Sequence, residues 1–316
     1  MNGKEKYRSL CRAELSIPVF SRDWWLDVVC GEGKWDVLLH EEKGRIRAAM
    51  PLYLPLPKVV SMPPYTQTMG VWFAAEAGDT KYTTALGQRQ AICRGFTSEL
   101  AKYRAFLQNF HYGVTDWLPF YWAGYCQTTR YTYLLNNIQS PEALWDNMSA
   151  HVRRNITKAK EKHRLSVRRD VPTEDFLRAC SLTFERQGKK TLHIDVLKRL
   201  INVCRERGQG DLWGGYDESG RLHAAAFIVW QESSAWYLAG GADPSLRDSG
   251  AHALVLWEAI RAVAAYTPRF DFEGSMLPGV ERFFREFGAI QTPYFTISRG
   301  KISLWDKALI KLHHWI

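Results

Sequence analysis

The order of apolar runs in the second half of the chain limits its possible folds more than any other feature. Helical periodicity marks residues 173–186 and 193–207, and the second run has an apolar stripe through Val196, Leu200 and Val203. Further strand-like and helical runs follow at 211–216, 222–230, 234–240, 249–266, 270–272, 279–287 and 291–298. A meander of strands followed by strand–helix alternation predicts an α/β (α+β) domain, a mixed, twisted sheet flanked by helices.

The first half has a similar but poorer pattern. Its predicted elements are a hairpin around the turn 41–44, a proline-rich break over 51–64, a helix over 87–103, and strand-like runs over 105–110 and 117–135. Ser140 before Pro141 and Glu142 predicts a helix start, and a basic helical segment continues to about Arg164. A weakly duplicated chain is therefore expected, with domains over 1–135 and 136–300 and a tail over 301–316.

Composition narrows the class of protein. The formal net charge is +9, which favours anionic partners such as nucleotides, RNA, phosphorylated carriers or an acidic membrane, although a merely basic surface is equally consistent with it. The six cysteines form no Cys-x-x-Cys pair, and the nine histidines are scattered, so no metal site is expected. Neither a signal peptide nor a membrane span is visible, which predicts a cytoplasmic protein.

A glycine-containing loop between a predicted strand and a long helix is the sharpest motif. The stretch 237–252 ends a strand in Gly240 and Gly241 and opens a helix at Ser249 and Gly250. Small residues at a helix start allow an anion to approach the free backbone N–H groups, and Arg247 could reach the same phosphate. The alternative is a simple helix cap, with Ser249 as the cap and Gly250 needed for close packing.

Four segments resemble a known family. Arg247 to Ala251 resembles the pyrophosphate loop of the GNAT acyltransferases, with His252 at a position where that family has Gly or Ala. The segment 152–159 resembles the Arg-Asn-Ile-x-Lys-Ala stretch of the Fem peptidoglycan-bridge ligases and their acyl-CoA-using relatives. The segments 270–275 and 284–289 resemble the end of the same domain, although Phe284 stands where the Fem pattern has Lys.

This resemblance implies tandem GNAT-like domains, of which the first is degenerate. Fem-type proteins transfer an aminoacyl group from tRNA to an amine of a peptidoglycan precursor, and relatives use an acyl thioester of coenzyme A or of a carrier protein. The resemblance therefore implies coenzyme A as donor, held by Arg247, Ser249, Gly250, Ala251 and His252. The Phe284 departure favours the broader acyltransferase branch.

A basic segment runs from Arg153 to Arg169 and holds eight cations against one acid. Arg154 and Lys158 are four residues apart and would share a helix face. With Arg153 and with Arg285 further on, they are the candidates for binding the anionic part of a nucleotide-linked acceptor, or a tRNA. The alternative is an ordinary solvated face of an amphipathic helix.

Acid–base chemistry needs a group that deprotonates the acceptor amine. Glu273, at the end of a predicted buried strand, is the first candidate, and His223 is the second. The strand alternation puts Asp271 and Glu273 on one face and Phe270 and Phe272 on the other. Each candidate could instead be structural, with Glu273 paired to Arg282 or Arg285. No Gly-x-Ser-x-Gly nucleophile motif is present.

The leading hypothesis is an N-acyltransferase that moves an acyl group from an acyl thioester to a primary amine. The alternatives are a Fem-like aminoacyl-tRNA-dependent ligase acting on a cell-wall precursor, and a non-catalytic GNAT-fold module that binds RNA or anionic lipid. The tail has Ile302, Trp305, Leu309, Leu312 and Ile316 at helical spacing. It could lie on an acidic membrane, but packing on its own domain is favoured.

Overall fold

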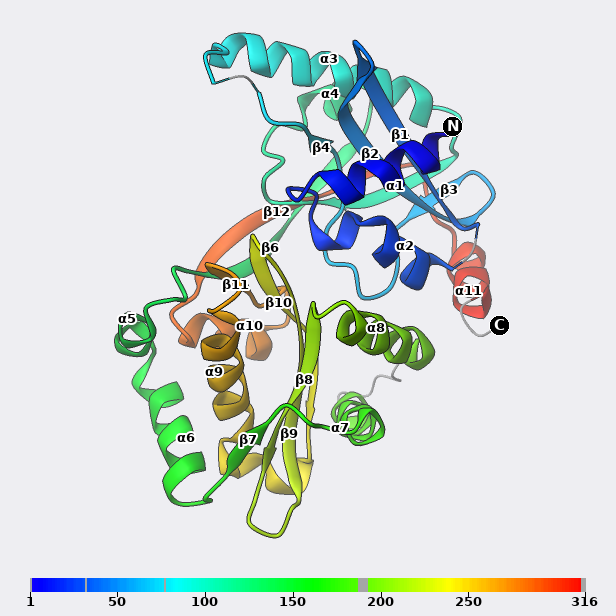
Figure 1. Cartoon of the computed structure of the whole chain (residues 1–316). Helices are drawn as coiled ribbons and strands as arrows, with labels where there is room; N and C mark the ends of the chain where they lie inside the picture. Colours follow the sequence, from blue (N-terminus) through cyan, green and yellow to red (C-terminus); the bar gives the residue numbers. More distant parts are fainter. Residues whose placement is uncertain (1, 32, 77, 187–192, 314–316) are drawn as a thin grey trace. The chain divides into compact units, whose positions relative to one another are not determined.

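The computed structural model describes residues 2–31, 33–76, 78–186 and 193–313. The chain forms two compact units, one comprising Met1–Arg130 with Pro293–Ile316 and the other Tyr131–Thr292. Both units are mixed α/β structures in which helices flank a sheet (Figure 1).

Unit 1 is built around an antiparallel hairpin of β1 (Trp35–Glu42) and β2 (Arg45–Leu56). The strand order is β1-β2-β3-β5-β12, and β4 pairs with β2. Its other elements are α1 (Gly3–Ala13), η1 (Val19–Ser21), α2 (Asp23–Cys30), β3 (Val59–Ser61), β4 (Trp72–Phe73), α3 (Tyr82–Leu100), β5 (Ala105–Phe110) and α4 (Leu118–Trp122), together with the second half of β12 (Ile290–Arg299) and α11 (Leu304–His313). The hairpin was predicted, but α1 and α2 were not.

Unit 2 has the strand order β6-β11-β10-β9-β8-β7. Its elements are β6 (Cys126–Asn136), α5 (Pro141–Asn147), α6 (Ala150–Glu161), β7 (Ser166–Arg168), α7 (Thr173–Arg186), α8 (Ile194–Glu206), β8 (Gly210–Tyr216), β9 (Leu222–Gln231), β10 (Ser234–Ala242), η2 (Pro244–Ser249), α9 (Ala251–Val263), β11 (Arg269–Asp271) and α10 (Pro278–Glu286). The predicted meander and the alternation after it are confirmed.

Helices cover both faces of the sheet in unit 2. Figure 1 shows α6 beside α9 on one side of the strands and α7 with α8 on the other. The central helix α9 is largely apolar, and nine of its thirteen residues are buried. Its polar positions, His252, Glu258 and Arg261, leave only a narrow polar side, because the sheet covers one side of the helix and α6 another.

The structure corrects three parts of the predicted pattern. The break expected over 51–64 is strand through Leu56 and again over Val59–Ser61, so Pro51 and Pro55 lie within β2. Leu118–Trp122, expected to be strand, is the helix α4, because Pro119 suits the first turn of a helix and cannot donate to a sheet. The single helix expected from Ser140 to Arg164 is divided by extended backbone at Met148. Ser149 then caps α6 by accepting a hydrogen bond from the Val152 N–H at 3.2 Å, whereas the Ser140 side chain makes no cap bond.

The C-terminal residues lie differently from the expected tail. Residues 295–299 pair with β5, so the stretch from Pro293 onward belongs to unit 1. The start of α11 is held by an ion pair between Arg104 and Asp306, while Leu304 and Trp305 are 82% and 81% exposed. The predicted apolar position at Ile316 lies outside the described residues. Among the helices described, none is both long and apolar enough to cross a membrane.

Candidate active site

The centre of unit 2 opens where two parallel strands separate. β10 pairs with β11 only at Ala235 and Trp236, after which β11 ends at Asp271 while β10 continues to Ala242. A bulge interrupts the pairing of β10 with β9 between Tyr237 and Ala239. Beyond Trp236, one edge of β10 therefore faces no strand in the described part of the chain, and its backbone groups can bind a ligand.

Two carboxyl groups lie at this opening. Asp271 is fully buried, and its Oδ1 accepts hydrogen bonds from the Thr132 hydroxyl and, at 2.8 Å, from the Glu273 backbone N–H. Asp271 Oδ2 and Glu273 Oε1 are buried without a hydrogen-bond partner among the described residues. Burial raises the pKa of Asp271 to about 7. Burial, and then the charge of Asp271, raise the pKa of Glu273 well above its usual value.

These carboxyl groups are placed by the local alternation that the sequence predicts. Phe270 and Phe272 pack together in the apolar core with ring centroids 5.0 Å apart, so Asp271 points the other way. Glu273 then takes a left-handed backbone conformation with φ of 58°. The structural alternative, a pairing of Glu273 with Arg282 or Arg285, is not formed, because Arg282 pairs with Glu286 and Arg285 with Glu281, each at 2.8 Å.

A tyrosine and a histidine that meet across β10 and α9 adjoin the carboxyl groups. The Tyr237 hydroxyl and His252 Nε2 are 3.0 Å apart. Burial, and then the charges of Cys180 and Glu273, raise the pKa of Tyr237, so this hydroxyl stays protonated. Sequence reasoning missed Tyr237, although it is four residues before Gly241 on the strand that enters the glycine loop. It assigned His252 to phosphate binding alone.

The helix start predicted near Ser249 is present, and the short 3-10 helix η2 precedes it. Asp243 caps η2 by accepting the Ser245 N–H at 2.8 Å, and Gly250 has the left-handed φ of 75°. Ser249 is buried, and its hydroxyl accepts the Ala251 N–H at 3.3 Å. The first backbone hydrogen bond of α9 runs from the Leu254 N–H to the Gly250 carbonyl at 3.3 Å, so the Ala253 N–H lies ahead of the helical ladder. Arg247 is exposed, and these groups suit an anionic ligand.

Close packing of α6 leaves no room for a side chain at position 250. A Cβ atom there would be 2.4 Å from the Asn155 carbonyl oxygen, which real Cβ atoms do not tolerate. The close-packing role of Gly250 is therefore present in the structure. The same contact brings α6 directly beside the loop.

Three of the predicted binding residues line one groove along α6. Arg153, Arg154 and Lys158 border a cavity of about 740 Å³ together with Trp145 and Lys162. Arg153 also donates to the carbonyl groups of Trp145 and Asp146, at 3.3 and 3.2 Å, and so closes the end of α5. Arg154 and Lys158 have no ion pair with any described residue, so they can bind an anion.

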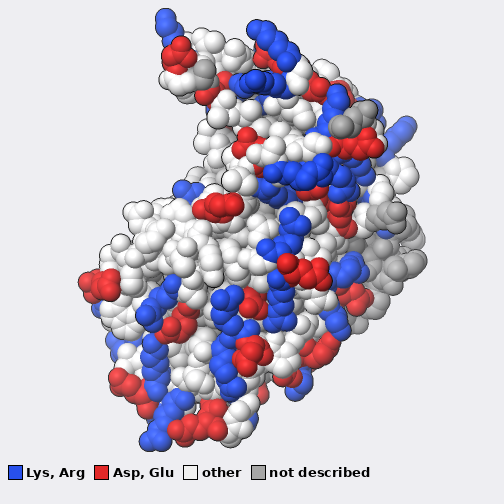
Figure 2. Space-filling model, viewed as in Figure 1, with Lys and Arg blue, Asp and Glu red and all other residues white. Residues whose placement is uncertain are grey.

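The rest of the basic segment is largely compensated by acids. Lys160 pairs with Glu258 at 2.7 Å, Arg164 with Glu218 at 3.4 Å and Arg169 with Asp211 at 3.3 Å. Figure 2 accordingly shows Lys and Arg side chains interleaved with Asp and Glu over unit 2 rather than a continuous positive surface. The groove on α6 holds three cations of this segment, Arg154, Lys158 and Lys162, that have no ion pair with a described residue.

His223 and Arg285 lie in other surroundings. His223 is buried, its Nε2 is 3.2 Å from Asp217 Oδ2, and its carbonyl accepts the Asp243 N–H. The next residue, Ala224, pairs with Ala242 of β10, whereas Asp271 pairs with Trp236 of the same strand. These two positions on β10 are six residues apart, which is roughly 20 Å along a strand. The structure therefore does not bring His223 to Glu273. Arg285 is on α10, paired with Glu281, which also accepts from the Tyr133 hydroxyl at 2.8 Å.

Comparison with known proteins identifies the class. Residues 146–285 match the model of an acetyltransferase (GNAT) domain. The structure is similar to the crystal structure of FemX, with a TM-score of 0.68, 12% identity and 99% of each chain covered. Residues 146–285 thus match the GNAT acetyltransferase family by sequence, and the whole chain shares the fold of FemX and of a tandem GNAT protein.

Two further structures have the same fold. The L-PGS of Bacillus licheniformis matches with a TM-score of 0.54 and 12% identity, over 99% of this chain and 96% of its own. A tandem GNAT protein from the clavulanic acid biosynthesis pathway matches with a TM-score of 0.51 and 10% identity, over 94% of both chains. No curated protein matches the chain by sequence. The described residues include no group of three or more His, Cys, Asp or Glu side chains that could hold a metal ion.

Proposed function

We propose that unit 2 transfers an acyl group from an acyl thioester, of coenzyme A or of a carrier protein, to a primary amine. The observation that carries this proposal is the carboxyl group of Glu273, whose Oε1 is buried without a hydrogen-bond partner among the described residues, at the point where β10 and β11 separate. In this proposal residues 136–300 are the catalytic domain and residues 1–135 a degenerate copy.

The proposed proton transfer follows from the environment of Glu273. An acceptor enters as an ammonium ion, whose positive charge favours the carboxylate form of Glu273 against the effect of burial. Glu273 takes a proton from the ammonium group, and the resulting amine attacks the acyl carbonyl carbon. Backbone N–H groups on the open edge of β10 donate hydrogen bonds to the carbonyl oxygen as its charge grows. The C–S bond then breaks, and the departing thiolate takes up the second proton that the attacking nitrogen releases, which leaves an amide and a free thiol. Tyr237, which stays protonated, is the O–H group next to this step.

The donor's phosphates are proposed to lie at the start of α9. The start of α9, from Ala251 through His252 to Ala253, and the exposed Arg247 would face these phosphates, and Ser249 and Gly250 would keep the backbone close to them. The groove of Arg153, Arg154 and Lys158 would hold the anionic part of a nucleotide-linked acceptor. The ion pair of Arg285 with Glu281 makes Arg285 the weakest of the proposed binding residues.

The decisive test compares Glu273→Gln with Glu232→Gln, a control in the exposed turn between β9 and β10. Acyl transfer to a panel of primary amines is followed by release of free thiol from acetyl-CoA and longer acyl-CoAs. We expect Glu273→Gln to lower kcat by about a hundredfold while the affinity for the donor is nearly unchanged, with partial recovery at high pH. Wild-type turnover of Glu273→Gln from pH 6 to pH 9 would remove Glu273 as the base.

A Fem-like aminoacyl-tRNA-dependent ligase is the second candidate, favoured by the groove of uncompensated cations on α6. Retardation of tRNA in a low-salt gel, with an affinity that falls steeply with salt, would support it, because several phosphates are neutralised together. Stabilisation by coenzyme A without tRNA retardation would support the thioester donor. Stabilisation by neither, with no turnover, would favour a non-catalytic module that binds anionic lipid.

A further inference from the structure

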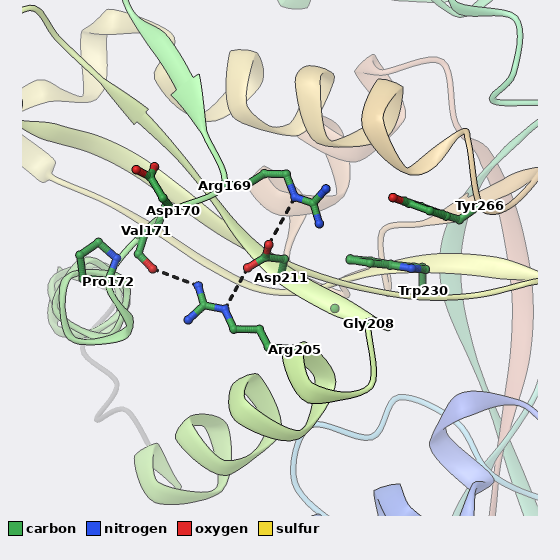
Figure 3. A pocket seen from close by; sticks show the side chains of 10 residues that line it. Arg169, Asp170, Val171, Pro172, Arg205, Gly208, Asp211, Trp230 and Tyr266 are labelled. Atoms are coloured by element: carbon green, nitrogen blue, oxygen red, sulfur yellow. Dashed lines mark hydrogen bonds and ion pairs between the residues drawn. The ribbon is translucent and has the colours of Figure 1, made fainter.

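A second pocket lies in unit 2, outside the candidate active site. Its volume is about 630 Å³, and its lining comes from the residues after β7, the end of α8, the start of β8 and the end of β9 (Figure 3). Tyr266, just after the C-terminal end of α9, completes it. The loop before α9, where the donor phosphates are proposed to bind, is at the other end of this thirteen-residue helix, about 20 Å away at 1.5 Å per residue.

Arg205 lines this pocket, and its guanidinium group donates hydrogen bonds to other groups of the protein. Arg205 donates to Asp211 Oδ1 at 2.9 Å, to the Val171 carbonyl at 3.0 Å and to the Thr173 hydroxyl at 3.2 Å. Asp211 Oδ1 also accepts the Leu212 N–H at 2.8 Å. The charges of Arg205 and Asp211 therefore compensate each other, and both side chains are fixed.

A second arginine, Arg169, retains free donors. Its Nε donates to Asp211 Oδ2 at 3.3 Å, but its two Nη groups have no acceptor in the described part of the chain. The guanidinium carbon lies 5.0 Å from the ring centroid of Trp213 and 5.7 Å from that of Trp230, which orients the group. Because Asp211 is already balanced by Arg205, the cluster has a net positive charge at the Arg169 fork.

An aromatic wall stands next to this fork. Trp230 and Tyr266 are stacked with ring centroids 5.4 Å apart and an interplanar angle of 12°. Figure 3 shows the Arg169 guanidinium turned toward these two rings, with Asp170 turned away. Trp230 is 6% exposed and Tyr266 is 50% exposed, so Tyr266 presents ring surface to solvent. A planar ligand can pack there while an attached anion reaches the Arg169 Nη groups.

We propose that this pocket binds a small aromatic molecule carrying one anionic group, with Arg169 as the anion ligand and the Trp230–Tyr266 pair as the ring platform. Carboxylate and phosphate share this chemistry, so the ligand is either an aromatic carboxylate or a nucleotide. The proposal does not depend on acyl transfer.

Calorimetric titration of the full chain tests it with adenosine 5′-monophosphate and indole-3-acetate, and with the uncharged adenosine and indole-3-acetamide. We expect at least one anion to bind about tenfold more tightly than its neutral counterpart. Arg169→Gln and Tyr266→Ala should each weaken this binding about tenfold or more. The matched control is Arg168→Gln, since Arg168 is the preceding residue but stacks on Tyr216 outside the pocket, 4.3 Å from its ring centroid.

Each outcome of this titration bears on the site. Binding of indole-3-acetate alone identifies a carboxylate site, and binding of the nucleotide alone a phosphate site. Binding that survives Arg169→Gln belongs elsewhere in the chain and overturns the proposal, as does the absence of binding by either anion. The Tm of Tyr266→Ala is measured as a control for folding. We expect it to be nearly unchanged, because this side chain is half exposed, so a loss of affinity would not reflect a loss of fold.

Discussion

Replacing Asp271 by Asn tests the environment of the candidate base without touching Glu273. Asn has nearly the same shape, and its side-chain oxygen can still accept the hydrogen bonds from Thr132 and from the Glu273 N–H. The substitution removes the group whose pKa burial raises from 3.8 to about 7. It therefore removes the cost of ionising a carboxyl group at this position, together with the part of the raised pKa of Glu273 that the Asp271 charge causes.

The sign of the effect follows from proton binding. Between pH 4 and pH 7 the native protein keeps a proton on Asp271 that the unfolded chain has released, so the free energy of unfolding falls as the pH rises through this window. A raised pKa of this size corresponds to about 4 kcal/mol at ~1.36 kcal/mol per unit. Asp271→Asn lacks this loss, so the two proteins should be equally stable near pH 4. The variant should be more stable at pH 8, by as much as about 4 kcal/mol.

The assay is thermal unfolding of both proteins from pH 4 to pH 8, with exposed Asp79→Asn as the control. For a unit of this size, even half of the expected effect raises the Tm by about 4–8 °C at pH 8. Tm curves of wild type and variant that run parallel over this pH range would refute the reasoning, because Asp271 would then be ionised at no cost. A variant destabilised at every pH would show instead that the charge itself is needed as an acceptor.

Three further predictions concern the neighbouring elements. Gly250→Val should lower the Tm of the protein and should also abolish its stabilisation by coenzyme A. Gly279→Val, at a position with open space around it, should do neither. Measuring the Tm of each variant with and without coenzyme A distinguishes these effects. Replacing Arg154 and Lys158 together by Gln should weaken binding of the anionic ligand about tenfold and reduce its salt dependence, while Arg164→Gln, a surface ion-pair residue, should change little in the same titration. His223→Asn should lower the Tm, since Asp217 loses its buried partner, and should leave the pH profile of turnover per folded molecule unchanged; an altered profile would return His223 to the reaction.

The sequence predicted the elements of unit 2 because most of them combine strong periodicity with clear ends. The strand alternation around Phe270 and Phe272 also placed Asp271 and Glu273 on the same side. The helices α1 and α2 were missed, although Asn2 and Glu5 form a reciprocal capping box that could have marked the start of α1. The helix α4 was missed because its Tyr and Trp residues are typical of strands. Pro119, which is typical of the first turn of a helix, was the signal in favour of a helix.

The sequence could not predict which polar side chains meet. His223 resembled a candidate base until its register on β9 and its contact with Asp217 were known, and neither depends on local pattern. The stacking of Trp230 on Tyr266 joins residues 36 positions apart, at the end of β9 and after α9. The basic segment looked uniform because its compensating acids, Glu258, Glu218 and Asp211, come from later elements.

The backbone at Glu273 and Gly274 shows why this opening is a site rather than a weak point of the fold. Both residues are left-handed, with φ of 58° and 64°, and for a non-glycine residue this costs roughly 1–2 kcal/mol. A Cβ atom at Gly274 would lie 2.0 Å from the Tyr131 carbonyl oxygen, so the turn is held against the neighbouring backbone of β6. The turn places the Glu273 carboxyl group where its Oε1 has no partner in the described protein, a second unfavourable contribution. Neither cost stabilises the native state. Under the proposed function, a strained turn that holds an unsatisfied acid beside the open edge of β10 is explained by a proton exchanged with a bound amine.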